Sequence, residues 1–237
     1  VIEDPSALKS FAVGVAVDPD AVLLSAQRRA EVEALVLKNF DKDNGGFGDT
    51  HRFIHGDTVE WALERGRDLQ RNPEPAPWRD VSGKTLGGAQ RLIDPVWGGM
   101  FQYSDKLDWS GPHYEKLLNI QRDAIRAYVL AFQVGGDPAP AGLAAAKDTA
   151  RWLMDFMQSP EGAFFTSQDA DAGPDLHGDA FYARSDAERR AGPQPPIDRN
   201  SYARENGWAI ASLAALYDVM ARRFEPVGMV YLWPTTR

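Results

Sequence analysis

Residues 97–118 have the sequence WGGMFQYSDKLDWSGPHYEKLL, and this stretch is the most informative indicator of the fold. Its paired glycines permit tight turns that other residues resist, and Pro112 is well placed to open a long helix. Loops run over the protein surface, where polar residues are common. Because this loop is instead dense in Trp, Tyr, Phe and His, we expect it to be packed down or shaped around a ligand. We therefore expect the functional site near it.

The glycine-aromatic pattern repeats along the chain. Asp41-x-x-x-Gly45-Gly46-Phe47 and Asp94-x-x-x-Gly98-Gly99-Met100 share one spacing, and Glu161-Gly162-Ala163-Phe164 is a looser third copy. Each copy follows one expected helix and precedes another. A repeat of roughly 50 residues, built from two helices and a loop, is typical of stacked helical hairpins. Such hairpins form superhelices or close into α/α toroids, in which inner helices line a central cavity.

Apolar residues at helical spacing predict six helices. We expect them over about residues 18–40, 57–69, 81–92, 112–134, 143–157 and 202–224. The prolines of residues 72–77 exclude a helix there, residues 166–200 form a long polar region, and the last helix is apolar nearly all round, which predicts burial. Almost no alternating strand pattern is present. The sequence therefore predicts an all-α fold, with helical hairpins arranged as a six-hairpin-like α/α toroid or a partial one, in a single domain over residues 1–237.

Composition limits the partners. A net charge of −8 argues against nucleic acid and anionic membranes, because both bind a basic surface. No apolar run approaches the ~18 residues of a membrane span. The absence of cysteine excludes thiol chemistry, disulfides and thiolate metal sites. No signal peptide is visible, and the lack of an initial Met indicates that N-terminal sequence is missing. The sequence does not identify the cellular compartment, although the cytoplasm is slightly favoured.

Three ordered blocks resemble a known family. Residues 98–118 are similar to the Gly-Gly-Phe-x-Arg-Tyr-Ser…Trp-x-Val-Pro-His-Phe-Glu-Lys-Met-Leu signature of proteins that carry a thioredoxin-like domain followed by an α/α toroid. That toroid is of the N-acylglucosamine 2-epimerase and six-hairpin glycosidase type, and the family includes the spermatogenesis-associated protein 20 group. Residues 44–48 and 161–171 match two further blocks in the same order. The resemblance implies a toroid and, as candidate activities, sugar isomerisation, epimerisation or glycoside hydrolysis.

The sequence also departs from that family. The Arg before Tyr-Ser is Gln102, and the Ala-Pro-Lys-Phe-Pro stretch after the first Gly-Gly-Phe-Gly is replaced by residues 49–54. No thioredoxin domain is present in the chain, which holds about half the hairpins that a closed ring needs. We expect part of a longer family architecture or a natural short form, or else an oligomer or a partner that completes the toroid.

Asp108, His113 and Glu115 are candidate catalytic groups. Sugar hydrolysis uses two carboxylates about 5–10 Å apart, and epimerisation uses a base and an acid across a carbon. The alternative is that residues 112–115 form a helix start, in which Pro takes the first turn and Glu favours the positive helix end. Both interpretations stay open at this point.

Asp169 and Asp171 are candidate partners for Glu115, since like charges in proximity raise one pKa. Closely spaced acids could also bind Ca²⁺, but the spacing does not fit the twelve-residue EF-hand loop. A third interpretation is that these acids cap turns. His51 and His55 have a metal-compatible spacing but lack an obvious third ligand. We predict no metal and no cofactor.

Aromatic residues and one amide form the expected sugar-contacting wall, because the apolar face of a sugar ring packs on aromatic rings. These candidate substrate-binding residues are Trp97, Tyr103, Trp109, Phe165 and Gln168. The alternative is that they pack the hairpin ends.

Two functions from different classes follow. The first is a carbohydrate-binding or carbohydrate-modifying pocket that takes a small-molecule sugar. The second is a non-catalytic helical scaffold that binds a protein partner. They differ in one feature, which is whether the acids and His113 converge on one opening or serve as separate caps.

Overall fold

The computed structural model describes residues 25–67, 74–135 and 139–224. The chain divides into two compact units, Val1–Lys38 and Asn39–Arg237. Helix α1 (Ala26–Asn39) belongs almost wholly to the first unit and confirms the described part of the first expected helix, whose residues 18–24 lie outside the described ones. The prediction of a single domain stays a prediction. The remaining description concerns the second unit.

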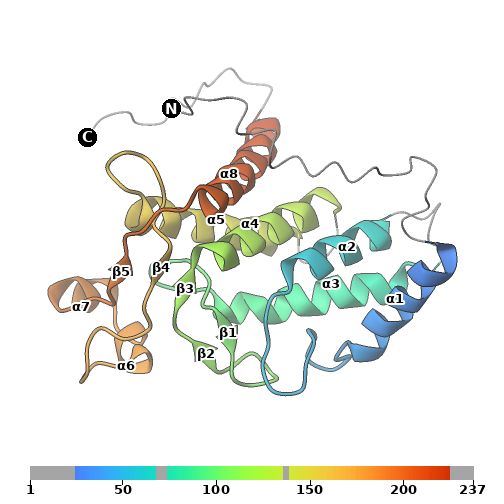
Figure 1. Cartoon of the computed structure of the whole chain (residues 1–237), viewed down its shortest axis with the longest axis horizontal. Coiled ribbons are helices and arrows are strands. Elements are labelled where there is room, and N and C mark those ends of the chain that lie inside the picture. Colours follow the sequence, from blue (N-terminus) through green and yellow to red (C-terminus); the bar gives the residue numbers. More distant parts are fainter. Residues whose placement is uncertain (1–24, 68–73, 136–138, 225–237) are drawn as a thin grey trace, which may run out of the picture. The chain divides into compact units, whose positions relative to one another are not determined.

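The second unit is built mainly from helices in two rows (Figure 1). Helices α2 (Gly56–Arg67), α4 (Leu118–Gln133) and α8 (Ala203–Phe224) pack in that order, while α3 (Ala76–Ala89) packs on α2, and α5 (Ala139–Trp152) packs on α4. Among the described residues α3 and α5 are not close neighbours of each other. In a ring of helical hairpins, neighbouring helices of the inner circle pack against one another more closely than those of the outer circle do. We therefore call α2, α4 and α8, which pack on one another in sequence, the inner row.

The repeated glycine-aromatic pattern forms the same turn twice. The amide of Asp41 donates to the carbonyl of Gly46 at 3.0 Å, and the amide of Asp94 donates to that of Gly99 at 2.9 Å. All four glycines of the two pairs have φ between 74° and 81°, which a side chain would oppose. The third copy closes a similar turn one residue shorter, between Gln158 and Phe164. These three turns confirm the repeat.

Short strands join the loops that precede the inner-row helices. Strand β1 (Tyr103–Ser104) pairs with β2 (Pro112–His113), and β3 (Lys116–Leu117) pairs with β4 (Ser167–Gln168), which pairs with β5 (Ile197–Asp198). All three pairings are antiparallel. Strands of two residues leave no alternating pattern to see in the sequence.

The expected helix start at Pro112 is wrong. Residues 112–113 and 116–117 form short strands, and α4 begins only at Leu118. The physical reason is cross-strand pairing, because Lys116 and Leu117 pair with β4 and the carbonyl of Glu115 accepts the amide of Gln102 at 2.8 Å. A local helix signal is thereby overridden by partners from two other segments.

One further expectation is wrong, and one region holds helices that the pattern did not indicate. Helix α3 begins at Ala76 rather than after residue 77, because Pro77 lies in the first turn, where an amide hydrogen has no helical partner. The long polar region contains the short helices α6 (Gly178–Tyr182) and α7 (Asp186–Ala191), and a capping box of Ser185 and Glu188 begins α7.

The last helix is buried on one side only. Ala209, Leu216 and Val219 of α8 are buried, whereas Ile210 and Tyr217 are 63% and 69% exposed. The expectation that α8 is buried all round is therefore wrong, because its neighbours in the described part of the chain, α4 and α5, cover only one face. In the described part of the chain, each helix is too short or too polar to span a lipid bilayer.

Candidate functional site

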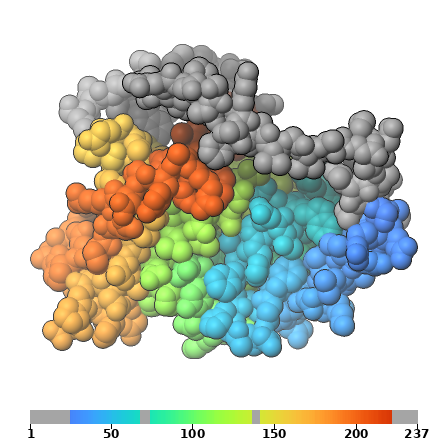
Figure 2. All heavy atoms as spheres, viewed as in Figure 1, coloured from blue at the N-terminus to red at the C-terminus, as the bar shows by residue number. Residues whose placement is uncertain are grey.

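The three glycine-aromatic loops meet at one end of the inner row. The first loop leads directly into α2, the second leads into α4 through β1, β2 and β3, and the third precedes the segment with β4, α6, α7 and β5 that leads into α8. The N-terminal ends of the three helices lie together near the small strands (Figure 1). Arg52 in the first loop bridges to Ser104 in the second, and β3 in the second loop pairs with β4 in the third. The segments also lie next to one another on the face shown in Figure 2, with the second loop (green) between the other two.

Tyr103 and His113 form the centre of an aromatic rim at this end. The β1–β2 register places them opposite each other, and their rings stack at 4.5 Å with an angle of 9° between the planes. Phe53 and His51 from the first loop lie 4.9 and 5.2 Å from the Tyr103 ring. Desolvation, with the charges of Asp105 and Glu115, raises the pKa of Tyr103.

His113 lies close to a carboxylate from its own loop. Its Nε2 atom is 3.9 Å from Oε2 of Glu115, and the two side chains are 37% and 38% exposed. Both groups are therefore reachable from solvent and close enough to exchange a proton through one water molecule.

A second carboxylate comes from the third loop. Asp171 accepts a hydrogen bond from the amide of Gly178 at 2.7 Å and lies 3.1 Å from Nδ1 of His177. The His177 hydrogen bond, together with that from Gly178, lowers the pKa of Asp171, and the charge of His113 contributes to the same shift. The hydrogen bond with Asp171 raises the pKa of His177.

Below this rim the inner-row helices carry a layer of ion pairs. Arg126 of α4 donates twice to Glu60 of α2, at 2.7 and 2.6 Å. Arg122 lies 3.3 Å from Asp57 and also donates to its neighbour Asp123. We call these five residues the charged layer. The Arg122 guanidinium stacks 5.5 Å from the ring of Trp208, so α8 joins the same surface.

Asp108 and Asp169 take the roles of turn caps. Asp108 accepts from the amide and the hydroxyl of Ser110, at 3.1 and 2.7 Å, and these bonds lower the pKa of Asp108. Asp169 accepts from the amide of Ala170 at 2.7 Å. These contacts favour the capping interpretation over a catalytic one for both residues.

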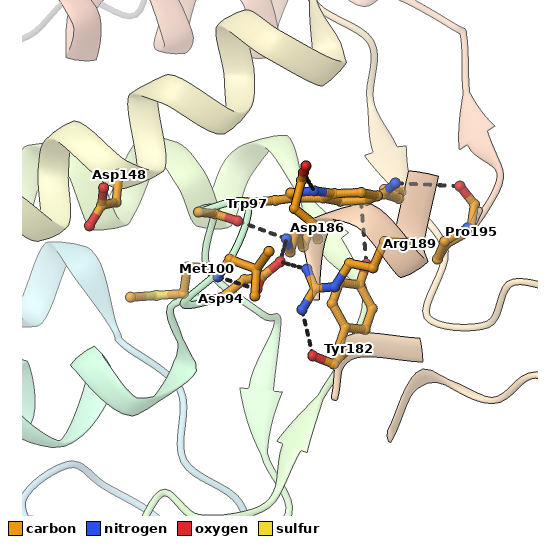
Figure 3. Close-up of polar contacts among 12 residues, drawn as sticks. Asp94, Trp97, Met100, Asp148, Tyr182, Asp186, Arg189 and Pro195 are labelled. Atoms are coloured by element: carbon orange, nitrogen blue, oxygen red, sulfur yellow. Dashed lines mark hydrogen bonds and ion pairs between the residues drawn. The ribbon is translucent and has the colours of Figure 1, made fainter. Parts of the chain in front are cut away.

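Three of the candidate substrate-binding residues are buried. Trp97 is 3% exposed and donates its indole hydrogen to Asp186 (Figure 3), and Gln168 is 1% exposed and donates to the carbonyl of Pro195. Trp109 donates to the carbonyl of Asn44 and fills the space above Gly88, where an added Cβ would lie 2.3 Å from the indole. The contacts of these three side chains are those of residues packed inside the protein, which favours the packing interpretation over sugar contact.

Phe165 keeps an accessible position. It is half-buried and stacks with the guanidinium of Arg199 at 5.7 Å. Together with Tyr103 it is a candidate ring for contact with a sugar.

The spaced histidines do not converge. Nε2 of His51 faces Asp105 at 3.3 Å, whereas His55 lies against the rings of Phe47 and Phe53 at 5.6 and 6.0 Å. Desolvation lowers the pKa of His55. In the part of the chain that the structure describes, no group of three His, Cys, Asp or Glu side chains is arranged to hold a metal.

The sequence interpretation missed the charged layer. Asp57 and Glu60 on α2, and Arg122 and Arg126 on α4, recur at spacings of three and four, which places each pair on one helical face. That signal was available, but it reads equally as an ordinary solvated surface. Only the packing of α2 on α4 shows that the two faces meet.

Comparison with solved structures defines the class of this fold. The chain resembles a cellobiose 2-epimerase from Spirochaeta thermophila, with a TM-score of 0.56 and 16% identity, over 82% of this chain and 49% of the other. A family 76 glycoside hydrolase from a bovine Bacteroides thetaiotaomicron strain gives 0.56 and 14%, over 83% and 40%. A D-mannose isomerase gives 0.54 and 12%, over 81% and 47%. The fold is an α/α toroid, and the match covers between 40% and 49% of the length of these proteins.

Sequence comparison adds a relative. No family model matches the chain. A segment of 143 residues is 26% identical to spermatogenesis-associated protein 20 of Mus musculus and 32% identical to that of Rattus norvegicus. The match covers 58% of this chain and 18% of each relative. The chain is thus a relative of the spermatogenesis-associated protein 20 group, as its three ordered blocks predict.

Proposed function

We propose that this chain supplies part of a carbohydrate-modifying site that moves a proton at a sugar carbon, as in epimerisation or isomerisation. The observation that carries the proposal is the contact of His113 with Glu115, on a ring stacked with Tyr103, at the end of the inner row. Sugar epimerases, isomerases and glycoside hydrolases among the structural neighbours support the choice of substrate class.

The chemistry suits these residues. Epimerisation removes a proton from the carbon next to a carbonyl and returns it to the other face, which needs groups that gain and lose protons near neutral pH. The ordinary pKa of histidine fits that task. In this proposal His113 takes the proton from one face of the carbon, Glu115 in its acid form returns a proton to the other face, and Tyr103 packs against the sugar ring. The proton held by His113 then passes to Glu115 through water, which restores both groups. Asp171 stabilises the imidazolium that forms.

Glycoside hydrolysis is the nearest alternative within the same class. It would use Glu115 and Asp171 as the two carboxylates, with one of them protonated. The lowered pKa of Asp171 fits the ionised partner. Glu115 would then be the acid, and His113 would be dispensable.

The experiment follows proton exchange directly. The chain is incubated in deuterated water with reducing sugars, and loss of the proton next to the carbonyl is followed by NMR. We expect exchange in the wild type and its loss in His113→Ala and Glu115→Gln. Asp108→Asn is the matched control, because that carboxylate caps an exposed turn. Exchange that survives both rim variants would overturn the proposed roles.

A second candidate function is a non-catalytic scaffold that binds a protein partner. The observation that favours it is the exposed pair Ile210 and Tyr217 on α8, since large apolar side chains grouped on one helical face mark interaction surfaces. If no sugar is bound, exchanged or released from a glycoside, this candidate replaces the first.

A further inference from the structure

The solvent-facing side of α8 carries an uncharged seam along most of the helix. Its six residues are all exposed and recur at alternating spacings of four and three: Ala203, Gly207, Ile210, Ala214, Tyr217 and Ala221. These are the spacings of the two core positions of a coiled-coil heptad, where side chains of one helix insert between those of another. Within the described part of the chain, α4 and α5 pack on the other side of α8 (Figure 1) and leave this seam exposed.

Large and small residues alternate along the seam. Ile210 and Tyr217 are 63% and 69% exposed, and each is flanked along the seam by glycine or alanine on both sides. A Cβ added at Gly207 would have no heavy atom within 4 Å. Glycine is less favourable than alanine in a helix interior, and no close neighbour in the described part of the chain requires its small size here. The space over Gly207 is therefore open to a large side chain from another molecule.

The seam is complementary to itself about a two-fold axis. A second copy that packs antiparallel on this face presents the same six residues in reverse order. Because the spacings are the same in both directions, the residues meet in matched layers: Gly207 with Tyr217, Ile210 with Ala214, and Ala203 with Ala221. Each large side chain thus meets a small one, as the interdigitation of a dense core requires. A two-fold axis brings the same face of both copies together, which is the symmetry of most dimers.

Charges beside the seam agree with this orientation. Arg204 follows Ala203, and Asp218 follows Tyr217, so the two charged residues lie on the same side of the seam. The Arg204 side chain is 72% exposed and contacts Glu205 at 2.7 Å. In the antiparallel arrangement Arg204 of one copy comes close to Asp218 of the second. Opposite charges beside an apolar contact set the orientation and the choice of partner.

We propose that α8 is an interface for a second copy of this chain, in which the two α8 helices pack antiparallel and Tyr217 of each copy covers Gly207 of the other. This inference does not rest on the carbohydrate function. It names a second copy as the occupant of the surface that also favours the scaffold candidate. Because one pair of helices makes a small contact area, the dimer should dissociate reversibly on dilution.

Sedimentation velocity of the full chain over a range of concentrations tests the inference. We expect a monomer–dimer equilibrium in the wild type, with a dissociation constant on the order of tenfold larger in Gly207→Leu, because the added side chain takes the space of Tyr217. Gly87→Leu is the matched control, since Gly87 is an exposed glycine of α3 where an added Cβ also has no heavy atom within 4 Å. Leucine favours the helix at both positions, so neither variant should lower the melting temperature of the monomer.

Each other result of this experiment counts against the inference. A wild type that stays monomeric at every concentration would overturn it and leave the seam to a different partner. Equal weakening by Gly207→Leu and Gly87→Leu would mean a general effect of an added apolar side chain. A dimer that Gly207→Leu leaves unchanged would place the interface elsewhere on the molecule.

A double variant tests the register of the two helices. Tyr217→Ala should by itself weaken the dimer on the order of tenfold, and its exposed position makes misfolding no obstacle. Combination of Gly207→Leu with Tyr217→Ala again places one large and one small side chain in the same layer. The double variant should therefore dimerise more tightly than Gly207→Leu alone. Losses that simply multiply in the double variant would show that these two residues do not meet, and would overturn the antiparallel arrangement.

Discussion

The Nζ atom of Lys116 lies 2.9 Å from Oδ2 of Asp94, and both side chains are fully shielded from solvent. Arg189 donates to the same oxygen at 2.7 Å (Figure 3). One carboxylate is thus shared by two buried cations, which come from the second glycine-aromatic loop and from α7. Lys116 follows Glu115 directly, and α7 follows the segment that carries Asp171 and His177. The network therefore fixes the backbone on which the proposed rim residues stand.

Loss of the shared carboxylate should destabilise the fold more than loss of either cation. Asp94→Asn leaves Lys116 and Arg189 buried without a counter-charge, and removal of one partner of a buried pair costs about 3–5 kcal/mol. Lys116→Met is similar in size and leaves the Asp94–Arg189 pair intact, so its cost should be smaller. Urea unfolding of the two variants checks this order, and the reverse order would contradict the shared role of Asp94.

Stability should rise with pH between about 8 and 9.5 because of Lys116. Burial, partly offset by Asp94, lowers the pKa of Lys116 from 10.5 to about 8. In the window between these values the unfolded chain binds more protons at this group than the folded chain does, so the free energy of unfolding increases with pH. Urea midpoints at pH 7.5, 8.5 and 9.5 measure the slope. Lys116→Met should lack this contribution, and an identical slope in both proteins would refute the assignment.

Replacement of Gly98 should be far more damaging than replacement of Gly162. Both glycines have positive φ, 77° and 94°, so alanine is strained at either position. This strain costs about 1–2 kcal/mol. At Gly98 a Cβ would also lie 2.1 Å from the carbonyl oxygen of Asp148, whereas nothing lies within 4 Å at Gly162. Gly98→Ala should therefore lose an additional ~1–3 kcal/mol or more through overpacking. Comparable unfolding curves would argue against the close approach at Gly98.

The imidazole of His177 should titrate above its ordinary value of 6.5. The hydrogen bond to Asp171 raises the pKa of His177, and the same bond lowers the pKa of Asp171. The His177 contribution to stability is therefore present below its unfolded pKa and is lost as pH rises through the folded one. The Asp171 contribution is present above the unfolded pKa and is lost as pH falls through the folded one. NMR titration of wild type and Asp171→Asn measures both effects. In the variant the His177 curve should return towards 6.5, and an unmoved curve would show that the pair does not form in solution.

The hairpin architecture was determined by local signals in the sequence. Glycine pairs such as Gly45–Gly46 and Gly98–Gly99 require backbone angles that side chains oppose, so their spacing marks the turns whatever packs around them. Helical periodicity is likewise local, and it placed α2 and α8 within about two residues of their observed bounds and identified α4 and α5, although α4 begins six residues later than expected. The resemblance of three ordered blocks to the toroid family rested on these same positions.

Tertiary structure alone decided which acids could act together. Asp108 and Glu115 are both acids in one aromatic loop, yet Asp108 bonds its own turn while Glu115 faces His113. The ion pairs of Arg122 with Asp57 and of Arg126 with Glu60 join residues 65 and 66 positions apart. Such pairs depend on how helices pack, which periodicity within one helix does not encode. The sequence by itself therefore set the repeat, and the packing of the inner row decided which charged side chains of α2 and α4 meet.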